Sequence, residues 1–367
     1  MAGPPRALLP VVVALANAFA PNGLAHDQAR ILPFTGWTQP RRVAVVLNAN
    51  ARRVDDEVVA WVKRVVPEQD LFLSHSLEDL PRIADKLVAR GFDAVLWGGG
   101  DGTFANGVAA LCAAAGAGGK MPDVGTLRLG TGNGIAYSLD ASPATPAGLA
   151  KDLERARLGT SRRPMQLLEV EGRPTVFTGF GLDAQILDDL GRTVGSLDKM
   201  GLADTLKSAE LRYFLTVTSR SIPRFLASER PEVVAINRGA PAQRVDKDGN
   251  PIGAPVPAGR VLWRGRATLA SCGAIEHYGL AMKMFPHAGR ESGRFQLRLT
   301  DLGAGMILAN LPQIWKGRFD HERLYDFLAD EVELVVSRPM PLQSGGDLLG
   351  LRSRVTVGLW SRPVIAV

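Results

Sequence analysis

The chain has 367 residues, of which 46% are hydrophobic and 22% are charged, and its formal net charge at pH 7 is +6. A chain of this length and composition can form two domains with a substantial core, and wholesale disorder is excluded. The basic charge suits an anionic membrane surface, an anionic nucleotide or solubility alone. No RNA-binding signature accompanies it, so we expect no nucleic-acid partner. The two cysteines lie far apart and the five histidines have no metal-ligand spacing, which argues against a structural zinc site.

Residues 1–40 form an extension rich in proline, alanine and glycine. Arg6 is followed by an apolar run from Ala7 to Ala20, which has the basic start, apolar core and small-residue end of a signal peptide. The run is shorter than the roughly 20 residues that span a bilayer. Three interpretations stay open: a signal peptide, an apolar segment that lies against the protein or the inner leaflet, and a wrongly chosen start codon.

Residues 41–163 alternate between strand-like and helix-like patterns. Alternating strands and helices predict a parallel sheet that is covered by helices on both faces. The expected strands are residues 43–48, 70–73, 93–97 and 124–129, and the expected helices are residues 54–66, 77–90 and 104–115.

Residues 164–354 follow a different pattern, in which strands dominate and predict a mainly antiparallel sheet. A helical interval is expected over residues 197–219, and residues 239–259 form a turn-rich insertion between strands. The expected strands are residues 165–170, 175–178, 232–237, 261–271, 293–300 and 331–337.

A basic and apolar cluster occupies the end of the helical interval and the residues after it. Arg212, Arg220, Arg224 and Arg230 lie there among bulky apolar side chains. Such a segment suits docking onto anionic lipid, and an amphipathic core helix with solvated arginines explains it equally well.

The most informative segment is a glycine-rich turn that follows the third expected strand. Gly99, Gly100 and Gly102 let the backbone approach a ligand closely, and the N–H groups and helix dipole that follow attract an anion. A carboxylate in such a site is repulsive unless a cation shares it, so we expect Asp101 to act through Mg²⁺, directly or through water. Thr103 is expected to be the N-cap of the helix that follows. Neither the P-loop pattern nor the dinucleotide-binding pattern fits this turn.

A second glycine cluster follows the fourth expected strand. It contains Gly130, Thr131, Gly132 and Asn133, and it precedes a short helical stretch. Because the carboxyl ends of parallel strands meet at one edge of a sheet, we expect both loops to flank the same ligand.

Together these loops resemble the diacylglycerol kinase catalytic family, which includes bacterial lipid kinases, sphingosine kinases and ceramide kinases. NAD kinases and 6-phosphofructokinases share the first loop more distantly. The resemblance covers roughly residues 42–360 as an ordered series of motifs. The matching segments are residues 45–50, 99–103, 129–133, 179–184, 278–279, 285–288 and 291–295.

The resemblance implies a two-domain architecture with the active site in the cleft between the domains. Residues 41–163 would be an ATP-binding α/β domain similar to NAD kinases and phosphofructokinases. Residues 164–354 would be a mainly antiparallel β domain that contacts the lipid, and residues 355–367 would return to the first domain.

The resemblance also implies ATP and Mg²⁺ as cofactors and assigns roles to individual residues. Asp101 would organise Mg²⁺–ATP, and Asp347 stands in the place of the glutamate proposed as the general base of the family. The nucleotide would be held by Asn48, Gly99, Gly100, Asp101, Gly102, Thr103, Gly130, Thr131, Gly132 and Asn133.

The chain also departs from the family pattern. Arg128 stands where proline is usual, Gly134 where aspartate is frequent, and Gly345 where relatives have an aspartate that helps to organise the site. Asp347 is one methylene shorter than glutamate. The segment Glu291-Ser292-Gly293 replaces Asp-Asp-Gly, so the structural metal of some members is not carried over.

The expected function is phosphorylation of the hydroxyl of a membrane lipid, with diacylglycerol as the default acceptor and sphingosine or ceramide as alternatives. A soluble acceptor such as NAD fits less well, because residues 179–184 and 343–347 follow the lipid branch. The rival interpretation is a nucleotide-binding protein that has lost catalysis, for which Gly345 and Ser292 are the evidence. Because ATP is cytosolic, we expect a cytoplasmic protein that is peripheral on the inner face of the membrane. The sequence leaves open whether the protein forms homo-oligomers.

Overall fold

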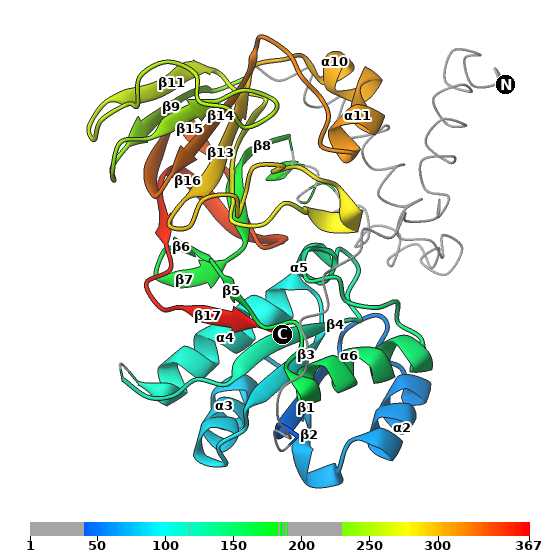
Figure 1. Cartoon of the computed structure of the whole chain (residues 1–367). Helices are drawn as coiled ribbons and strands as arrows, with labels where there is room; N and C mark the ends of the chain where they lie inside the picture. The colour runs from blue at the N-terminus through cyan, green and yellow to red at the C-terminus, as the bar shows by residue number, and fades with distance from the viewer. Residues whose placement is uncertain (1–39, 117, 183, 186, 188, 190–229) are drawn as a thin grey trace, which may run out of the picture.

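The computed structural model describes residues 40–182 except 117, residues 184, 185, 187 and 189, and residues 230–367. These residues form two sheets, one above the other in the view of Figure 1. Residues 1–39, the helical interval expected at residues 197–219, and Arg212, Arg220 and Arg224 lie outside the described residues.

In the described part of the chain, the first sheet has six strands in the order β2-β1-β3-β4-β17-β5. All neighbours are parallel except β17 and β5, which confirms the predicted parallel α/β domain. The elements of this domain are β1 (Val43–Asn48), α2 (Asp56–Val65), β2 (Leu71–Ser74), α3 (Asp79–Ala89), β3 (Ala94–Gly99), α4 (Asp101–Ala115), β4 (Asp123–Arg128), α5 (Gly134–Ser138), α6 (Pro146–Leu158), β5 (Arg163–Met165) and β17 (Val364–Ala366).

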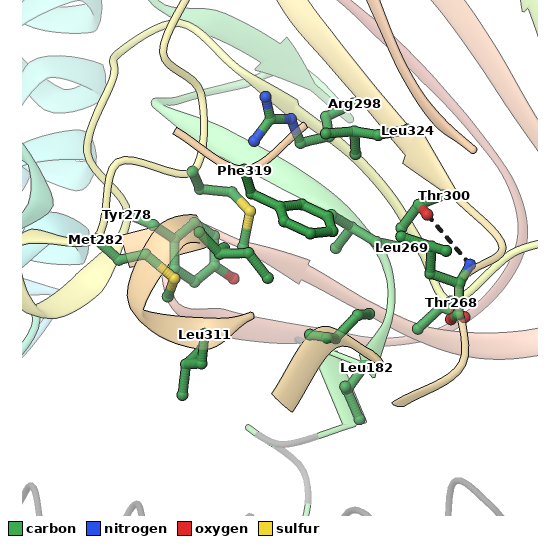
Figure 2. Close-up of a pocket in the computed structure, with 14 residues that line it drawn as sticks. Leu182, Thr268, Leu269, Tyr278, Met282, Arg298, Thr300, Leu311, Phe319 and Leu324 are labelled. Atoms are coloured by element: carbon green, nitrogen blue, oxygen red, sulfur yellow. Dashed lines mark hydrogen bonds between the residues drawn. The ribbon is translucent and has the colours of Figure 1, made fainter. Parts of the chain in front are cut away.

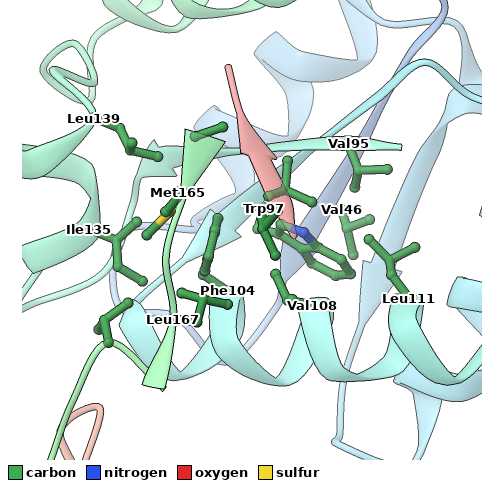
Figure 3. Packing of buried hydrophobic residues seen from close by; sticks show 14 of the residues in the cluster. Val46, Val95, Trp97, Phe104, Val108, Leu111, Ile135, Leu139, Met165 and Leu167 are labelled. Atoms are coloured by element: carbon green, nitrogen blue, oxygen red, sulfur yellow. The ribbon is translucent and has the colours of Figure 1, made fainter. Parts of the chain in front are cut away.

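Helices cover both faces of this sheet because apolar side chains alternate along its strands. In β1, Val45 packs in the core formed with α2 and α6, whereas Val46 packs in the core formed with α3 and α4. Trp97 of β3 is fully buried in the second core, beside α4 (Figure 3). Gly107 of α4 permits this contact, because a Cβ at that position would lie 2.5 Å from the Trp97 ring.

The start of α4 differs from the prediction. The helix begins at Asp101 rather than at Phe104, and its N-cap is Gly100, which makes no side-chain capping bond. The predicted N-cap role of Thr103 is therefore wrong, because this residue already lies in the first helical turn. The turn is shorter than the glycine pattern suggests, since β3 ends at Gly99 and only Gly100 separates it from the helix.

Among the described residues, the second sheet has eleven strands, and all of its strand pairs are antiparallel. This arrangement confirms the predicted β domain. Its strands are β6 (Leu168–Val170), β7 (Arg173–Thr175), β8 (Phe177–Gly181), β9 (Glu232–Asn237), β10 (Gln243–Val245), β11 (Val261–Arg266), β12 (Leu269–Gly273), β13 (Phe295–Thr300), β14 (Leu324–Ala329), β15 (Glu331–Ser344) and β16 (Asp347–Leu359). Two short helices, α10 (Ala304–Ala309) and α11 (Leu311–Trp315), lie between β13 and β14.

The single strand expected over residues 261–271 is wrong. The chain instead forms two strands with different partners: β11 pairs with β9, whereas β12 pairs with β13 and β8. Side-chain alternation within one run cannot reveal this change, because the partners are set by distant parts of the chain.

The two sheets are joined by a shared core and by a returning strand. Trp97 and Phe104 of the first domain belong to the same buried cluster as Phe177 and Phe285 of the second. After β16 ends at Leu359, the chain returns to the first sheet as β17, which lies parallel to β4. Within the described ranges, no helix combines the length and apolar character needed to cross a bilayer.

Candidate active site

The two glycine loops meet at the carboxyl edge of the first sheet, as predicted. The adjacent strands β3 and β4 are in register, with Gly99 paired to Arg128 at their carboxyl ends. The loops beyond this pair touch through their backbones, because a Cβ on Gly130 would lie 2.8 Å from the amide nitrogen of Gly100. Glycine is therefore required at position 130 for the two loops to approach each other.

Asn48 and Thr103 lie together beside the first loop. Asn48 stands at the carboxyl end of β1, and its Nδ2 donates to Thr103 Oγ1 over 3.0 Å. Its Oδ1 accepts from the backbone N–H of Asn50. Gly99 makes room for Thr103, since a Cβ at position 99 would lie 2.7 Å from Thr103 Cβ. The structure thus places both predicted nucleotide-site residues against the same turn.

Asp101 has a structural role that sequence reasoning missed. Its buried carboxylate links the loops: Oδ2 accepts from Gly134 N over 3.0 Å and Oδ1 accepts from Ile135 N over 2.8 Å. These are the first two N–H groups of α5, so Asp101 caps this short helix from a different element. Burial raises the pKa of Asp101 above its ordinary value; the two N–H bonds oppose this rise and the charge of Asp347 adds to it.

Asn133 shapes the second loop through its side chain. The residue is buried and left-handed, with φ 55° and ψ 32°. Its Oδ1 accepts from Gly130 N over 2.9 Å, and its Nδ2 donates to Gly130 O over 2.7 Å. Both ends of the amide are thus engaged within the loop, while Thr131 is exposed at its surface. These two hydrogen bonds fix the conformation of the loop, which explains why an asparagine follows the glycines.

Asp347 reaches the first loop from the second domain. It begins β16, directly after a two-residue turn in which Gly345 and Gly346 have φ 59° and 91°. Tight hairpin turns of this kind need positive φ at both central residues, so the glycines fix the position of Asp347. A Cβ on Gly102 would lie 2.9 Å from Asp347 Oδ2, which places the carboxylate against the first turn of α4. Partial burial raises the pKa of Asp347, although the residue as a whole stays exposed.

Residues 277–282 close over the second loop, and no sequence signal predicted this contact. Leu280 N donates to Gly132 O over 2.7 Å. Leu280 and Ala281 both have left-handed backbones, with φ 60° and 62°, which is costly for residues other than glycine. We call residues 277–282 the strap. Gly134 lets the strap approach, because a Cβ there would lie 2.9 Å from His277 O and 3.0 Å from Tyr278 O.

We expect Gly134→Ala to destabilise the protein by about 1–3 kcal/mol, because the added methyl group meets backbone atoms that cannot rotate away. Urea unfolding of the variant measures this effect. Gly303→Ala is the matched control, since a Cβ at Gly303 meets no atom within 4 Å. Equal stability of the two variants would contradict the proposed packing of the strap.

Arg128 stands where the resembled family usually has proline, and its side chain points toward α5. Its guanidinium carbon lies 3.9 Å from the centroid of the Tyr137 ring, and its NH2 group donates to the Tyr137 hydroxyl. Tyr137 in turn lies beside His277 of the strap, with ring centroids 6.1 Å apart. Arg128 therefore contacts α5 directly and the strap through Tyr137.

An apolar pocket of about 100 Å³ lies next to the strap in the second domain. Figure 2 shows Phe319 in the middle of the view, with Tyr278 and Met282 to one side and Leu269 to the other. Tyr278 and Met282 belong to the strap, so one segment contacts both the second glycine loop and this pocket. The lining residues are Leu182, Thr268, Leu269, Tyr278, Met282, Met284, Arg298, Thr300, Leu302, Ile307, Leu311, Ile314, Phe319 and Leu324.

Arg298, the charged residue that lines the pocket, is neutralised by a buried acidic partner. Arg298 is buried, and its Nε and NH2 groups donate to the two carboxylate oxygens of Asp326, both over 2.8 Å. Gln296 also donates to Asp326 over 2.7 Å. Because the pair is internally satisfied, the pocket presents mainly apolar surface to an occupant.

The donor set fits Mg²⁺ held together with a nucleotide. In the described part of the chain, no group of three or more His, Cys, Asp or Glu residues could hold a metal alone. Mg²⁺ usually binds through one or two carboxylates together with waters and substrate phosphates, and Asp101 is the carboxylate that could serve here. The pKa of Asp101 is raised in part by the charge of Asp347, and a cation beside Asp101 would offset this repulsion. Asp183 of the predicted motif at residues 179–184 lies outside the described residues.

Comparisons with known proteins agree with this arrangement. The model of the diacylglycerol kinase catalytic domain matches residues 18–169. No curated protein matches the chain. Three solved structures from Bacillus anthracis str. Sterne share its fold at 15% sequence identity.

Two of these structures are candidate diacylglycerol kinases, with TM-scores of 0.57 and 0.56, covering 88% and 90% of this chain and 95% and 98% of their own. The third is a diacylglycerol kinase with a TM-score of 0.54, covering 88% of this chain and 95% of its own. At this identity the structures show the fold. The domain model matches less than half of the chain, and over residues 18–169 it supports the diacylglycerol kinase catalytic family.

Proposed function

We propose that the protein is an ATP- and Mg²⁺-dependent lipid kinase that phosphorylates the hydroxyl of a membrane lipid, with diacylglycerol as the first acceptor to test. The observation that carries the proposal is the position of Asp347. A carboxylate from the second domain lies against Gly102, at the start of α4, where the two glycine loops meet. A phosphate cradle and a potential proton acceptor thus face the same space.

The residues of the cradle suit phosphoryl transfer, in which positioning and charge stabilisation do most of the work. The backbone N–H groups in the first turn of α4 have no partner within the helix and could bind an anion, and the helix dipole would add to their attraction. Mg²⁺, when bound, would neutralise charge on the phosphates. Asp101 holds α5 and the second loop in place, and Asp347 would accept the proton of the attacking hydroxyl.

The apolar pocket supports a lipid as the acceptor. Its lining is almost entirely hydrocarbon, and the strap connects it directly to the second glycine loop. A single acyl or alkyl chain in this pocket would lie beside the strap, which contacts the second glycine loop. Diacylglycerol, sphingosine and ceramide all carry such a chain and a free hydroxyl, so sphingosine and ceramide remain the alternative acceptors.

We expect Ile307→Trp to raise the KM for a long-chain acceptor by about tenfold and to leave the KM for ATP unchanged. The indole would displace about two methylene groups from the pocket, at a cost of roughly 0.8 kcal/mol each. Met306→Trp is the matched control, because Met306 is its exposed neighbour and does not line the pocket. An equal effect of both variants would argue against a chain in this pocket.

The test of the function is transfer of labelled phosphate from ATP–Mg²⁺ to diacylglycerol, sphingosine, ceramide and monoacylglycerol in mixed micelles. A labelled lipid that disappears with Asp347→Asn supports the proposal and names the acceptor. ATP binding without any labelled lipid favours the rival, a nucleotide-binding protein without catalysis, for which Gly345 is the evidence.

A further inference from the structure

Two exposed leucines follow Asp347 on β16. Leu348 is 39% exposed and Leu351 is 63% exposed, and the two lie within four residues of each other on one strand. Leu351 pairs across the hairpin with Pro341, and the next residue, Arg352, pairs with Met340. We call Met340, Pro341, Leu348 and Leu351 the hairpin edge. It is an apolar edge that directly continues the candidate active site.

Charge changes along the hairpin from this edge toward its far end. Next to the edge stand Arg338, Arg352 and Arg354, of which Arg352 pairs with Glu171 and Arg354 pairs with Glu333. At the opposite end, Glu331 pairs with Gly358 and lines an acidic groove together with Glu169, Glu171 and Asp330. The hairpin thus carries apolar side chains beside Asp347, arginines along its middle and carboxylates at its far end.

We propose that the hairpin edge docks on an anionic bilayer and inserts Leu348 and Leu351 at the level of the lipid headgroups. The proposal rests on the proposed lipid-kinase function. A base that deprotonates a lipid hydroxyl has to stand near the membrane surface, and these leucines follow it within four residues. Arginines beside the edge attract anionic headgroups, and the carboxylates of the acidic groove lie at the opposite end of the hairpin.

A bilayer fits this edge better than a second copy of the chain does. A stable protein interface buries about 800 Å² on each partner, far more than two leucines and their neighbours supply. A partner seated there would also cover Asp347, which has to stay open to the acceptor. The membrane surface, in contrast, delivers the acceptor to the same place.

The experiment is co-sedimentation of the full chain with phosphatidylcholine vesicles that contain or lack phosphatidylserine. We expect binding to the anionic vesicles, weakened at least about tenfold by Leu351→Asp and weakened by high salt. Leu77→Asp is the matched control, because Leu77 is 64% exposed on the first domain and should leave binding unchanged. ATP affinity and melting temperature of each variant show that the fold is intact.

Leu351→Trp gives a second readout that does not depend on a disruptive change. Its fluorescence should shift to the blue on anionic vesicles if the side chain enters the headgroup region. The proposal is overturned if the wild-type protein does not bind anionic vesicles or if Leu351→Asp binds them as the wild type does. It is also overturned if Leu351→Asp instead dissociates a dimer. Because vesicle binding needs no catalysis, these results are independent of whether a lipid is phosphorylated.

Discussion

Asp347→Asn is expected to lower kcat for lipid phosphorylation by about 10²–10⁴ and to leave the affinity for ATP within about twofold. The amide has nearly the same shape as the carboxylate, so the turn of Gly345 and Gly346 should still present it against Gly102. What it cannot do is accept the proton of the acceptor hydroxyl. Loss of rate with retained binding is therefore the signature of a base.

Steady-state kinetics with the best acceptor, together with calorimetric titration of ATP–Mg²⁺, measure this prediction. Asp326→Asn is an unsuitable control because it would leave Arg298 buried without its partner charge. Asp140→Asn serves better, since Asp140 is an exposed carboxylate outside the cradle. Unchanged kcat in Asp347→Asn would exclude Asp347 as the base.

The pH dependence of the reaction provides an independent check on the same group. Partial burial raises the pKa of Asp347 above the ordinary value of 3.8, and a general base works only when it is deprotonated. The value of kcat/KM should therefore fall as the pH drops through this raised pKa, and the fall should begin closer to neutrality than for an ordinary aspartate. The residual activity of Asp347→Asn should lack this acid limb.

Asp101→Asn is the second substitution with a large expected effect, and it should damage both binding and stability. The asparagine can accept from only one of the two N–H groups that Asp101 now satisfies, and its own NH₂ group would face the other. An unsatisfied buried N–H costs about 1–3 kcal/mol. Loss of the carboxylate also removes the group proposed to organise Mg²⁺, so affinity for ATP–Mg²⁺ should fall at least about tenfold.

Asp152→Asn separates the two effects. Asp152 is another buried carboxylate with a raised pKa, and it accepts from Ser142 N and Ser142 Oγ, neither of which belongs to the glycine loops. Urea unfolding should show a loss of stability in both variants, whereas ATP–Mg²⁺ titration should show weaker binding only in Asp101→Asn. Normal binding by a folded Asp101→Asn protein would leave Asp101 with its capping role alone.

Much of the first domain follows from local sequence patterns. The alternation of apolar residues in β1 predicts burial on both faces, and the glycines at 99, 100 and 130 mark where the chain leaves two neighbouring strands. These features depend on a few adjacent residues, so a single sequence reveals them. The sequence predicts a later start for α4 than the structure has, because Asp101 and Gly102 are poor helix formers by themselves. Their helical conformation depends on the packing around the turn.

The sequence by itself determined the class of fold, the two glycine loops and the order of the motifs. Each of these features depends on a short run of residues, and the residue types in that run determine the local backbone conformation. Only the tertiary structure decided that Asp101 caps α5, that the strap packs on Gly134, and that Asp347 stands against Gly102. Each of these contacts joins residues from different elements, and most join the two domains. Their geometry depends on how the two sheets share one core, and no local pattern in the chain encodes that arrangement.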